Sequence, residues 1–200
     1  MTLVDTFLSG LVPRLLEDEA PMWALIDGAA ASDLHRLRAR WPHAPDSLVE
    51  LLSRVDGTHY RTYRNGVVCV LMLGSDIEMY PYYLRSVEQI FEDSAQWERQ
   101  GKSIRSIYGK WLGEDVHILG AGIDPDLPVE QRLCFSHCFN NGGTSKLYLD
   151  FDPAPGGNVG QVVRYLHDPD SYRVIAPNFD VYLQQLIDED YAFLNEEELG

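Results

Sequence analysis

The stretch that decides the fold runs from residue 147 to residue 163 and reads Leu147-Tyr148-Leu149-Asp150-Phe151-Asp152-Pro153-Ala154-Pro155-Gly156-Gly157-Asn158-Val159-Gly160-Gln161-Val162-Val163. An apolar run ends at Asp150, a loop rich in proline and glycine follows, and a second apolar run starts at Gln161. Short apolar runs bounded by glycine and proline are typical of strands. The stretch therefore predicts two strands, 146–151 and 161–166, joined by a loop over residues 152–158.

The upstream sequence predicts further strands by the same criterion. Segments rich in apolar and β-branched residues are separated there by turns that contain asparagine and glycine. Such turns commonly connect antiparallel strands. The predicted strands are 58–63 and 67–73 around the turn 64–66, then 116–119, and finally 132–139, which leads through the turn 140–143 into the strand at 146–151.

Helices are predicted on both sides of these strands. Within each one, apolar residues recur at intervals of three and four, which places them on one helix face. The predicted helices are 2–19, divided by Gly10 and Pro13; one capped by Ser32; one from Pro45 to Asp56-Gly57; one opened by the capping box 86–89 and reaching about Trp97; and one capped by Asn178. Residues 101–113 fit neither pattern, and we expect them to form a loop insertion.

The order of these elements indicates an α+β fold. Helices come first, strands follow and a helix closes the chain, without the strand–helix alternation of parallel sheets. We expect a central, mostly antiparallel sheet flanked by helices. We also expect residues 1–200 to form a single domain, with an N-terminal helical extension over about residues 1–20 and an acidic, frayed C-terminal tail over about 191–200.

The net charge is strongly negative. Sixteen Lys and Arg residues stand against 31 Asp and Glu residues, which gives a formal charge of −15 at pH 7. Phosphate backbones repel such a surface, so the charge argues against direct binding of nucleic acid. A basic protein would instead be attracted and steered toward the chain. An acidic surface that only keeps the protein soluble explains the same charge, and both interpretations stay open.

The sequence predicts a soluble, cytoplasmic protein without a membrane partner. The first residues lack the basic segment of a signal peptide, and no apolar run approaches the roughly 18 residues of a transmembrane helix. Cys69, Cys134 and Cys138 are an odd number of cysteines without the spacing of a disulfide framework. Reduced thiols are the simpler interpretation of this pattern.

No arrangement of residues predicts catalysis. The glycine-rich loop leads into a strand, whereas phosphate-binding loops lead into a helix. Cys134, His137 and Cys138 would alternate between the two faces of a strand, which argues against a common metal. Asp150 and Asp152 share a strand face and could be paired carboxylates or a cation site, but ordinary turn chemistry is the interpretation we favour. We therefore predict no catalytic residue, no cofactor and no metal.

The central stretch resembles the SUKH superfamily, which contains fungal Smi/Knr cell-wall regulators and many bacterial toxin-immunity proteins. The family pattern is an apolar strand, Asp-x-x-Pro, a glycine-rich turn and Gly-Gln before a second apolar run, and residues 147–163 match it. Residues 174–183 are similar to the family's closing helix, and residues 41–57 to its Pro-x-x-Leu…Asp-Gly helix. The resemblance covers about residues 20–190. Within it, the segment at about 90–113 matches nothing in the family pattern.

The resemblance implies an α+β fold, no enzyme activity and a role in binding proteins. Immunity members of the family bind a cognate toxin, often a nuclease, and block it, and an acidic chain suits a basic toxin. We therefore expect a non-catalytic immunity protein that neutralises a basic toxin domain by direct binding. The alternative is a regulatory or scaffold protein with several weak partners. An unrecognised hydrolase is the least favoured interpretation.

Three groups of residues are candidates for contact with a partner. The first matches the family motif, and we favour a structural role for it in the turn: Asp150, Asp152 and Gln161. The second is acidic, and a solvated helix face is its competing interpretation: Asp168, Asp170, Asp188, Glu189 and Asp190. The third consists of tyrosines that could anchor an interface, although packing is their commoner role: Tyr60, Tyr80, Tyr82 and Tyr83.

Overall fold

The computed structural model of the protein describes residues 1–77, 80–96, 100–114, 117–139 and 145–194. The helical elements are α1 (Leu3–Leu11), η1 (Val12–Arg14), α2 (Ala20–Trp23), α3 (Ala31–Arg40), α4 (Asp46–Arg54), α5 (Val87–Ser94), α6 (Ile104–Tyr108), α7 (Trp111–Glu114), η2 (Val129–Gln131), α8 (Phe179–Asp188) and η3 (Ala192–Leu194). The strands are β1 (Arg61–Tyr63), β2 (Gly66–Val68), β3 (Leu71–Leu73), β4 (Tyr82–Leu84), β5 (Leu133–Cys134), β6 (Ser136–Cys138), β7 (Lys146–Asp150), β8 (Gln161–Leu166) and β9 (Ser171–Ala176).

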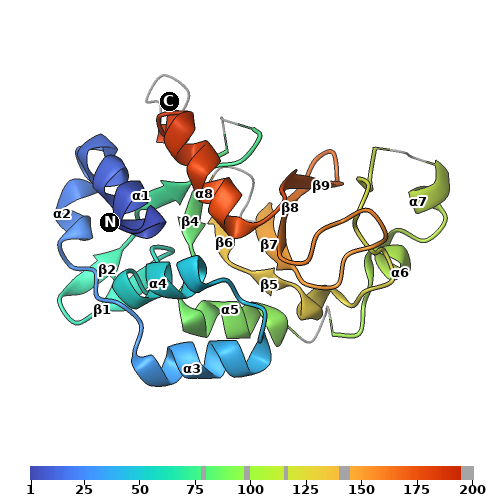
Figure 1. The fold of residues 1–200 in the computed structure, drawn as a ribbon, viewed down its shortest axis with the longest axis horizontal. Coiled ribbons are helices and arrows are strands. Elements are labelled where there is room, and N and C mark those ends of the chain that lie inside the picture. Colours follow the sequence, from blue (N-terminus) through green and yellow to red (C-terminus); the bar gives the residue numbers. More distant parts are fainter. Residues whose placement is uncertain (78–79, 97–99, 115–116, 140–144, 195–200) are drawn as a thin grey trace.

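The α+β class predicted from the sequence is confirmed. Strands β4–β9 occupy the middle of the molecule, α1 and α2 lie at one end with β1 and β2, and α6 and α7 lie at the other (Figure 1). The strands pair antiparallel in the orders β1-β2, β3-β4-β6 and β5-β7-β8-β9. Hydrogen bonds from the Phe135 N–H to the Leu147 carbonyl (3.1 Å) and from the Cys138 N–H to the Ser145 carbonyl (3.3 Å) join the last two sheets.

The sheet β5-β7-β8-β9 has a hydrophobic cluster on each of its faces. Along β7, Leu147 and Leu149 belong to the main cluster, whereas Tyr148 belongs to the second one. The main cluster includes buried residues of α1, α3, α4, α5 and α8, and the second includes residues of the segment 104–129. Because both faces are covered, every residue of β7 is buried. This explains why the middle of β7, residues 147–149, reads as a continuous apolar run in the sequence.

The segment that covers the second face corrects one expectation. The sequence predicted a loop insertion over residues 101–113, but α6 and α7 form there. Ser103 caps α6, since its hydroxyl accepts a hydrogen bond from the Ser106 N–H (3.2 Å). Ile104 is fully buried in the second cluster, where it packs with Val129. Helices this short are not stable alone, so burial against the sheet stabilises α6.

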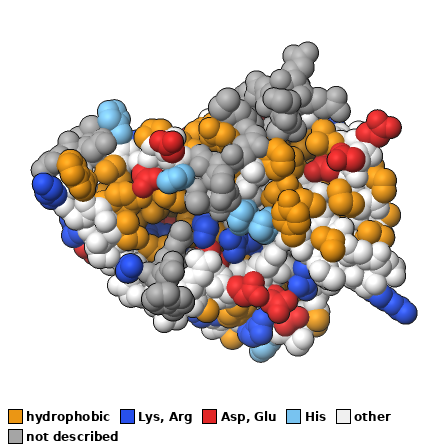
Figure 2. Space-filling model, turned by 180° about the vertical axis from the view of Figure 1, so that it is seen from behind, with side chains coloured by type: hydrophobic (Ala, Val, Ile, Leu, Met, Phe, Trp, Pro, Cys, Tyr) orange, Lys and Arg blue, Asp and Glu red, His pale blue; other side chains and the backbone are white. Residues whose placement is uncertain are grey.

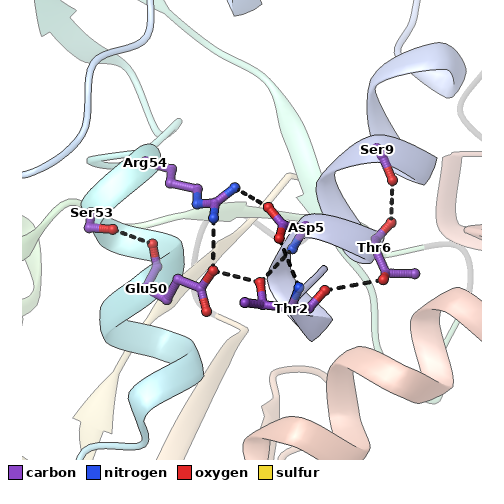
Figure 3. A network of polar contacts seen from close by, with 7 residues as sticks. All are labelled: Thr2, Asp5, Thr6, Ser9, Glu50, Ser53 and Arg54. Carbon is purple, nitrogen blue, oxygen red and sulfur yellow. Dashed lines mark hydrogen bonds and ion pairs between the residues drawn. The ribbon is translucent and has the colours of Figure 1, made fainter.

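The N-terminal helix is held against α4 by a network of polar contacts (Figure 3). Thr2 and Asp5 form a capping box, with bonds of 3.1 and 2.8 Å between each side chain and the other residue's N–H. The Arg54 guanidinium lies 2.5 Å from Asp5 Oδ1 and 2.9 Å from Glu50 Oε1. Residues on the inner side of α1 are fully buried in the main cluster: Val4, Phe7 and Leu11. Residues 3–11 thus pack within the same core as the rest of the chain.

The C-terminal helix begins as the sequence predicted, because Asn178 Oδ1 accepts a hydrogen bond from the Val181 N–H (2.8 Å). Beyond α8 the chain stays in the core. The Tyr191 hydroxyl donates to the Phe7 carbonyl (2.9 Å), and Phe193 and Leu194 are buried. Residues 191–194, expected at the start of an exposed tail, therefore pack inside the protein, whereas residues 196–198 lie outside the described part of the chain.

Several predicted boundaries differ from those in the structure. The predicted strand 132–139 is divided into β5 and β6, and the predicted strand 67–73 into β2 and β3. β4 and β9 were not predicted. The end of β9 was interpreted as a step into the last helix, and no element was assigned to residues 82–84. Of the strand expected at 116–119, the described part forms one parallel bridge between Leu119 and Tyr172. The predicted cap Ser32 lies inside α3, and the predicted turn 140–143 and Trp97 fall outside the described residues.

We predict that Leu183→Ala lowers the free energy of unfolding by about 2–5 kcal/mol, because Leu183 is fully buried in the main cluster and its truncation leaves a cavity. The control is Val181→Ala on the exposed side of the same helix, for which a change within about 0.5 kcal/mol is expected. Urea denaturation followed by circular dichroism measures both variants. Equal losses would contradict the assignment of α8's buried face.

Candidate functional site

Asp150 and Gln161 form a buried polar cluster at the base of the glycine-rich loop. Both side chains are 0% exposed. The Gln161 Nε2 group donates to Asp150 Oδ2 (3.3 Å) and to the Gly122 carbonyl (2.8 Å), and its Oε1 accepts from the Asn158 N–H (3.1 Å). The Arg132 Nε lies 3.4 Å from Asp150 Oδ2. The cluster thus fixes both ends of the loop and ties it to the neighbouring segment at Gly122.

Glycines allow this loop to close over the cluster. Gly160 donates its N–H to the Asp150 carbonyl (2.7 Å) with a φ of +84°, a conformation that L side chains rarely adopt. A Cβ on Gly157 would lie 2.4 Å from the Gly122 carbonyl oxygen, which excludes any side chain there. The family motif therefore builds a tight loop. Of the three motif candidates for partner contact, only Asp152 has an exposed side chain.

Asp168 and Asp170 lie in the turn between β8 and β9. Asp168 is exposed, whereas Asp170 is half-buried and accepts hydrogen bonds from the Tyr108 hydroxyl (2.6 Å) and the Tyr165 hydroxyl (3.2 Å). The His167 Nδ1 lies 3.0 Å from the same carboxylate. Burial raises the pKa of Asp170, but these hydrogen bonds together outweigh it, so the pKa lies below its ordinary value.

Asp188, Glu189 and Asp190 lie together at the end of α8, and all three are exposed. Asp188 accepts a hydrogen bond from the Gln184 side chain (2.7 Å), and Asp190 forms an ion pair with Arg14. The predicted acidic candidates therefore do not form one surface. They lie at the glycine-rich loop, in the turn between β8 and β9, and at the end of α8. The loop with Asp152 precedes the first residue of β8 and the turn with Asp168 follows its last residue, so the two are about 20 Å apart.

A surface that the sequence indicated only in part is a groove lined by aromatic residues. It lies between the segment 15–22 and strands β3 and β4, and encloses about 280 Å³. The ring of Tyr83 packs against those of Tyr60 and Phe139, each with a centroid separation of 6.1 Å. Tyr60 is 64% exposed and Phe139 46% exposed. We call this surface the aromatic groove; its main lining residues are Leu16, Glu19, Tyr60, Leu71, Tyr83 and Phe139.

Two stacked histidines adjoin the groove. The rings of His59 and His137 lie 3.8 Å apart and nearly parallel, and His59 also packs on Tyr83. Burial lowers the pKa of His59 to about 4 and also lowers that of His137, with further lowering of both by the nearby Arg85 charge. Both rings are therefore neutral at pH 7, and the stack carries no charge repulsion. Figure 2 shows histidine side chains next to hydrophobic ones on the face of the molecule opposite to that seen in Figure 1.

The exposed ring of Tyr60 is held by a strained backbone. Its φ is +48°, in the left-handed region that bulky residues rarely occupy. Strain of this kind is concentrated at functional sites, where the surrounding structure compensates for it. The neighbouring backbone provides that compensation, because the Thr58 and His59 N–H groups both donate to the Leu84 carbonyl (2.7 and 3.3 Å). Tyr60 is therefore held in the groove wall rather than in the core.

Glu19 is a buried carboxylate in the wall of the aromatic groove. It is 4% exposed, and its Oε1 accepts a hydrogen bond from the Leu71 N–H (2.7 Å). Its Oε2 has no hydrogen-bond partner among the described residues. Burial raises the pKa of Glu19 to about 7, an effect that the Leu71 and Leu16 amides partly offset and that the charge of Asp18 reinforces.

Sequence reasoning named part of this groove. Tyr60 and Tyr83 were among the four tyrosines considered as interface anchors, whereas Tyr82 is fully buried and Tyr80 partly buried. Glu19 and Phe139 were not named. Glu19 follows Glu17 and Asp18, so its burial has no local signal apart from the apolar residues Leu16 and Met22 on either side.

Among the described residues, no three His, Cys, Asp or Glu side chains are placed to hold a metal ion. No described helix is long and apolar enough to cross a membrane.

We predict that Asp150→Ala lowers the free energy of unfolding by about 3 kcal/mol or more, since it leaves the Arg132 charge buried without its partner. Asp152→Ala removes an exposed carboxylate from the same loop and is expected to change stability by less than about 0.5 kcal/mol. Thermal and urea unfolding of both variants measure the difference. An unaffected Asp150→Ala protein would contradict the structural role of the motif.

We also predict a pH-dependent gain in stability for Glu19→Gln relative to the wild type. The folded protein holds the Glu19 proton up to a pKa of about 7, against an ordinary value of 4.5, so wild-type stability falls as pH rises between these values. The variant lacks this titration. Its free energy of unfolding relative to wild type should therefore rise between pH 4 and pH 8 by an amount on the order of 3 kcal/mol. A constant difference in urea denaturation across this range would contradict the raised pKa of Glu19.

No curated protein matches this chain. The model of the SMI1/KNR4 family (SUKH-1) matches residues 28–185, which is most of the chain and includes α3, α4, all the strands and most of α8. The match agrees with the resemblance seen in the sequence over about residues 20–190. The chain therefore belongs to the SMI1/KNR4 family (SUKH-1).

Proposed function

We propose that this protein is a non-catalytic immunity protein that binds a basic toxin domain through the aromatic groove and neutralises it. SUKH domains are commonly immunity proteins, and this supports the general role. The observation that carries the proposal is the groove itself, in which the aromatic rings of Tyr60 and Phe139 are exposed beside carboxylates.

The composition of the groove fits a protein interface. Tyrosine is among the residues that contribute most binding energy at protein interfaces, especially where it lies in a hollow. Tyr60 and Tyr83 supply such rings, and contacts with His59 and Tyr83 hold the Tyr60 ring in place before any partner arrives. A side chain that is ordered in advance loses less conformational entropy on binding.

The charge of the chain supports a basic partner. Glu17 and Asp18 are exposed beside the groove, and the whole chain carries a formal charge of −15. Long-range attraction of this kind raises the rate of association more than the final affinity. The exposed acidic candidates Asp152, Asp168 and Asp188 lie elsewhere on the surface, and in this proposal they contribute to steering.

The remaining candidates take different roles in the proposal. Asp150 and Gln161 are fully buried, so they hold the glycine-rich loop and do not touch the partner. Asp170 is occupied by two tyrosine hydroxyls, and Asp190 by Arg14. Glu189 lines a shallow pocket at the end of α8 and adds to the acidic surface there.

We predict that the cognate toxin domain loses its toxicity when it is co-expressed with this protein, and that Tyr60→Ala weakens the complex at least tenfold. The physical reason is loss of the exposed ring in the groove. Isothermal titration calorimetry measures the affinity, and growth of the co-expressing cells measures neutralisation. Affinity and association rate are both expected to fall as salt rises from low to physiological concentration.

Trp111→Ala is the matched control, because Trp111 is a similarly exposed aromatic residue (57%, against 64% for Tyr60) on α7, at the opposite end of the molecule (Figure 1). It is expected to leave the affinity unchanged. A tight complex in which the toxin stays active would contradict the proposal. Several weak partners instead of one tight one would favour the regulatory or scaffold role.

A further inference from the structure

The unpaired oxygen of Glu19 identifies what the aromatic groove is built to receive. A buried polar atom without a hydrogen bond costs free energy, and a buried charge costs more unless it is paired. Among the residues that the structure describes, Glu19 Oε2 has no hydrogen-bond partner, whereas Oε1 accepts a hydrogen bond from the Leu71 N–H (2.7 Å). A partner that supplies a hydrogen-bond donor at Oε2 would remove the cost, so the site favours a donor and, at neutral pH, a cation.

The walls of the groove favour the same kind of ligand. Tyr60, Tyr83 and Phe139 surround the cavity with three aromatic rings, tilted to one another by 56° and 76°. Cations are attracted to the faces of such rings. Asp18 lies at the edge of the groove with an exposed carboxylate, so the charged residues that line the groove are acidic. An anion is disfavoured here, and a neutral apolar ligand would leave Oε2 unpaired.

We infer that the aromatic groove binds an arginine side chain of the partner protein, with the guanidinium paired to Glu19 Oε2 and stacked on the aromatic rings. This inference rests on the proposed function, in which the groove is the interface. Arginine fits better than lysine because its planar guanidinium stacks on aromatic faces and is more weakly hydrated than an ammonium group. Since Oε2 is covered in the free protein, binding rotates the Glu19 carboxylate toward the groove.

The inference carries a proton-linked consequence. Glu19 has a pKa of about 7 in the free protein, and an adjacent guanidinium favours the charged carboxylate. Binding therefore releases a proton below about pH 7, and the affinity for arginine rises between pH 5.5 and pH 8. The other titratable groups that line the groove are Asp18, Tyr60, Cys69 and Tyr83. Of these, the tyrosines stay neutral over this range because their pKa values are raised.

Titration with short capped peptides tests the inference on the full-length protein. The probes are acetyl-Gly-Arg-Gly-amide, its lysine counterpart and its citrulline counterpart, which keeps the planar shape of arginine without the charge. Nuclear magnetic resonance follows the Leu71 amide, whose N–H donates to Glu19. The arginine peptide is expected to shift this signal, with an affinity at least tenfold higher than that of the citrulline peptide and severalfold higher than that of the lysine peptide.

Two variants separate the site from the general attraction of an acidic protein. Glu19→Gln keeps the size of the side chain and an acceptor for the Leu71 N–H, and it should weaken arginine binding at least tenfold and abolish its pH dependence. Glu17→Gln makes the same change of charge at an exposed neighbour and should leave both unchanged. Equal binding by Glu19→Gln and wild type, in a variant whose spectrum shows it to be folded, would overturn the inference.

The test also distinguishes failure of the inference from failure of the proposed function, because the peptides require no toxin. Specific arginine binding without neutralisation of any toxin would support the groove and contradict the immunity role. If wild type and Glu19→Gln both neutralise a toxin and bind it with equal affinity, the immunity role is supported and the arginine site is contradicted.

Discussion

Burial of the sheet on both faces is the constraint on which the rest of this structure depends. Every residue of β7 is buried, including Lys146 and Asp150 at its two ends. A charged group in such a place needs a partner, and each one has it: Lys146 is paired with Asp93, and Asp150 with Arg132. The helices on one face and the segment 101–131 on the other follow from the same requirement, since an uncovered face would expose Tyr148 and its neighbours to water.

The aromatic groove lies where this burial ends. Its rings continue from the main cluster, because Tyr83 and Leu71 are buried while Tyr60 and Phe139 reach the surface. The glycine-rich loop, although it carries the family motif, is occupied by its own hydrogen bonds and has little chemistry left to offer a partner. The residues that define the family thus maintain the fold, and binding is better supported at a surface that the motif does not reach.

The sequence predicted the elements whose signals are local. The caps at Asn178 and Ser86, the division of the first helix near Pro13 and the strand 161–166 are all as expected, because each depends on a few neighbouring residues. The segment 101–113 was misjudged because α6 is stabilised by a sheet that lies far away in the sequence. The groove could be predicted only in part for the same reason. Tyr60 and Tyr83 could be named from the sequence because tyrosines are common at interfaces. The burial of Glu19 is evident only in the folded structure, where the Leu71 N–H donates a hydrogen bond to its carboxylate.

One wall of the groove comes from a part of the chain that the family model does not cover. The match begins at residue 28, whereas Leu16, Glu19 and Met22 all precede it. The proposed binding surface therefore combines residues of the shared fold, such as Tyr60 and Tyr83, with residues that lie outside the family match. In the proposed role, substitutions in residues 15–22 change the groove and so the choice of partner. They leave the sheet β5-β7-β8-β9 unchanged, so related proteins can differ in specificity and keep the same fold. In the proposed immunity role, this arrangement lets one wall of the contact surface change while the rest of the fold stays constant.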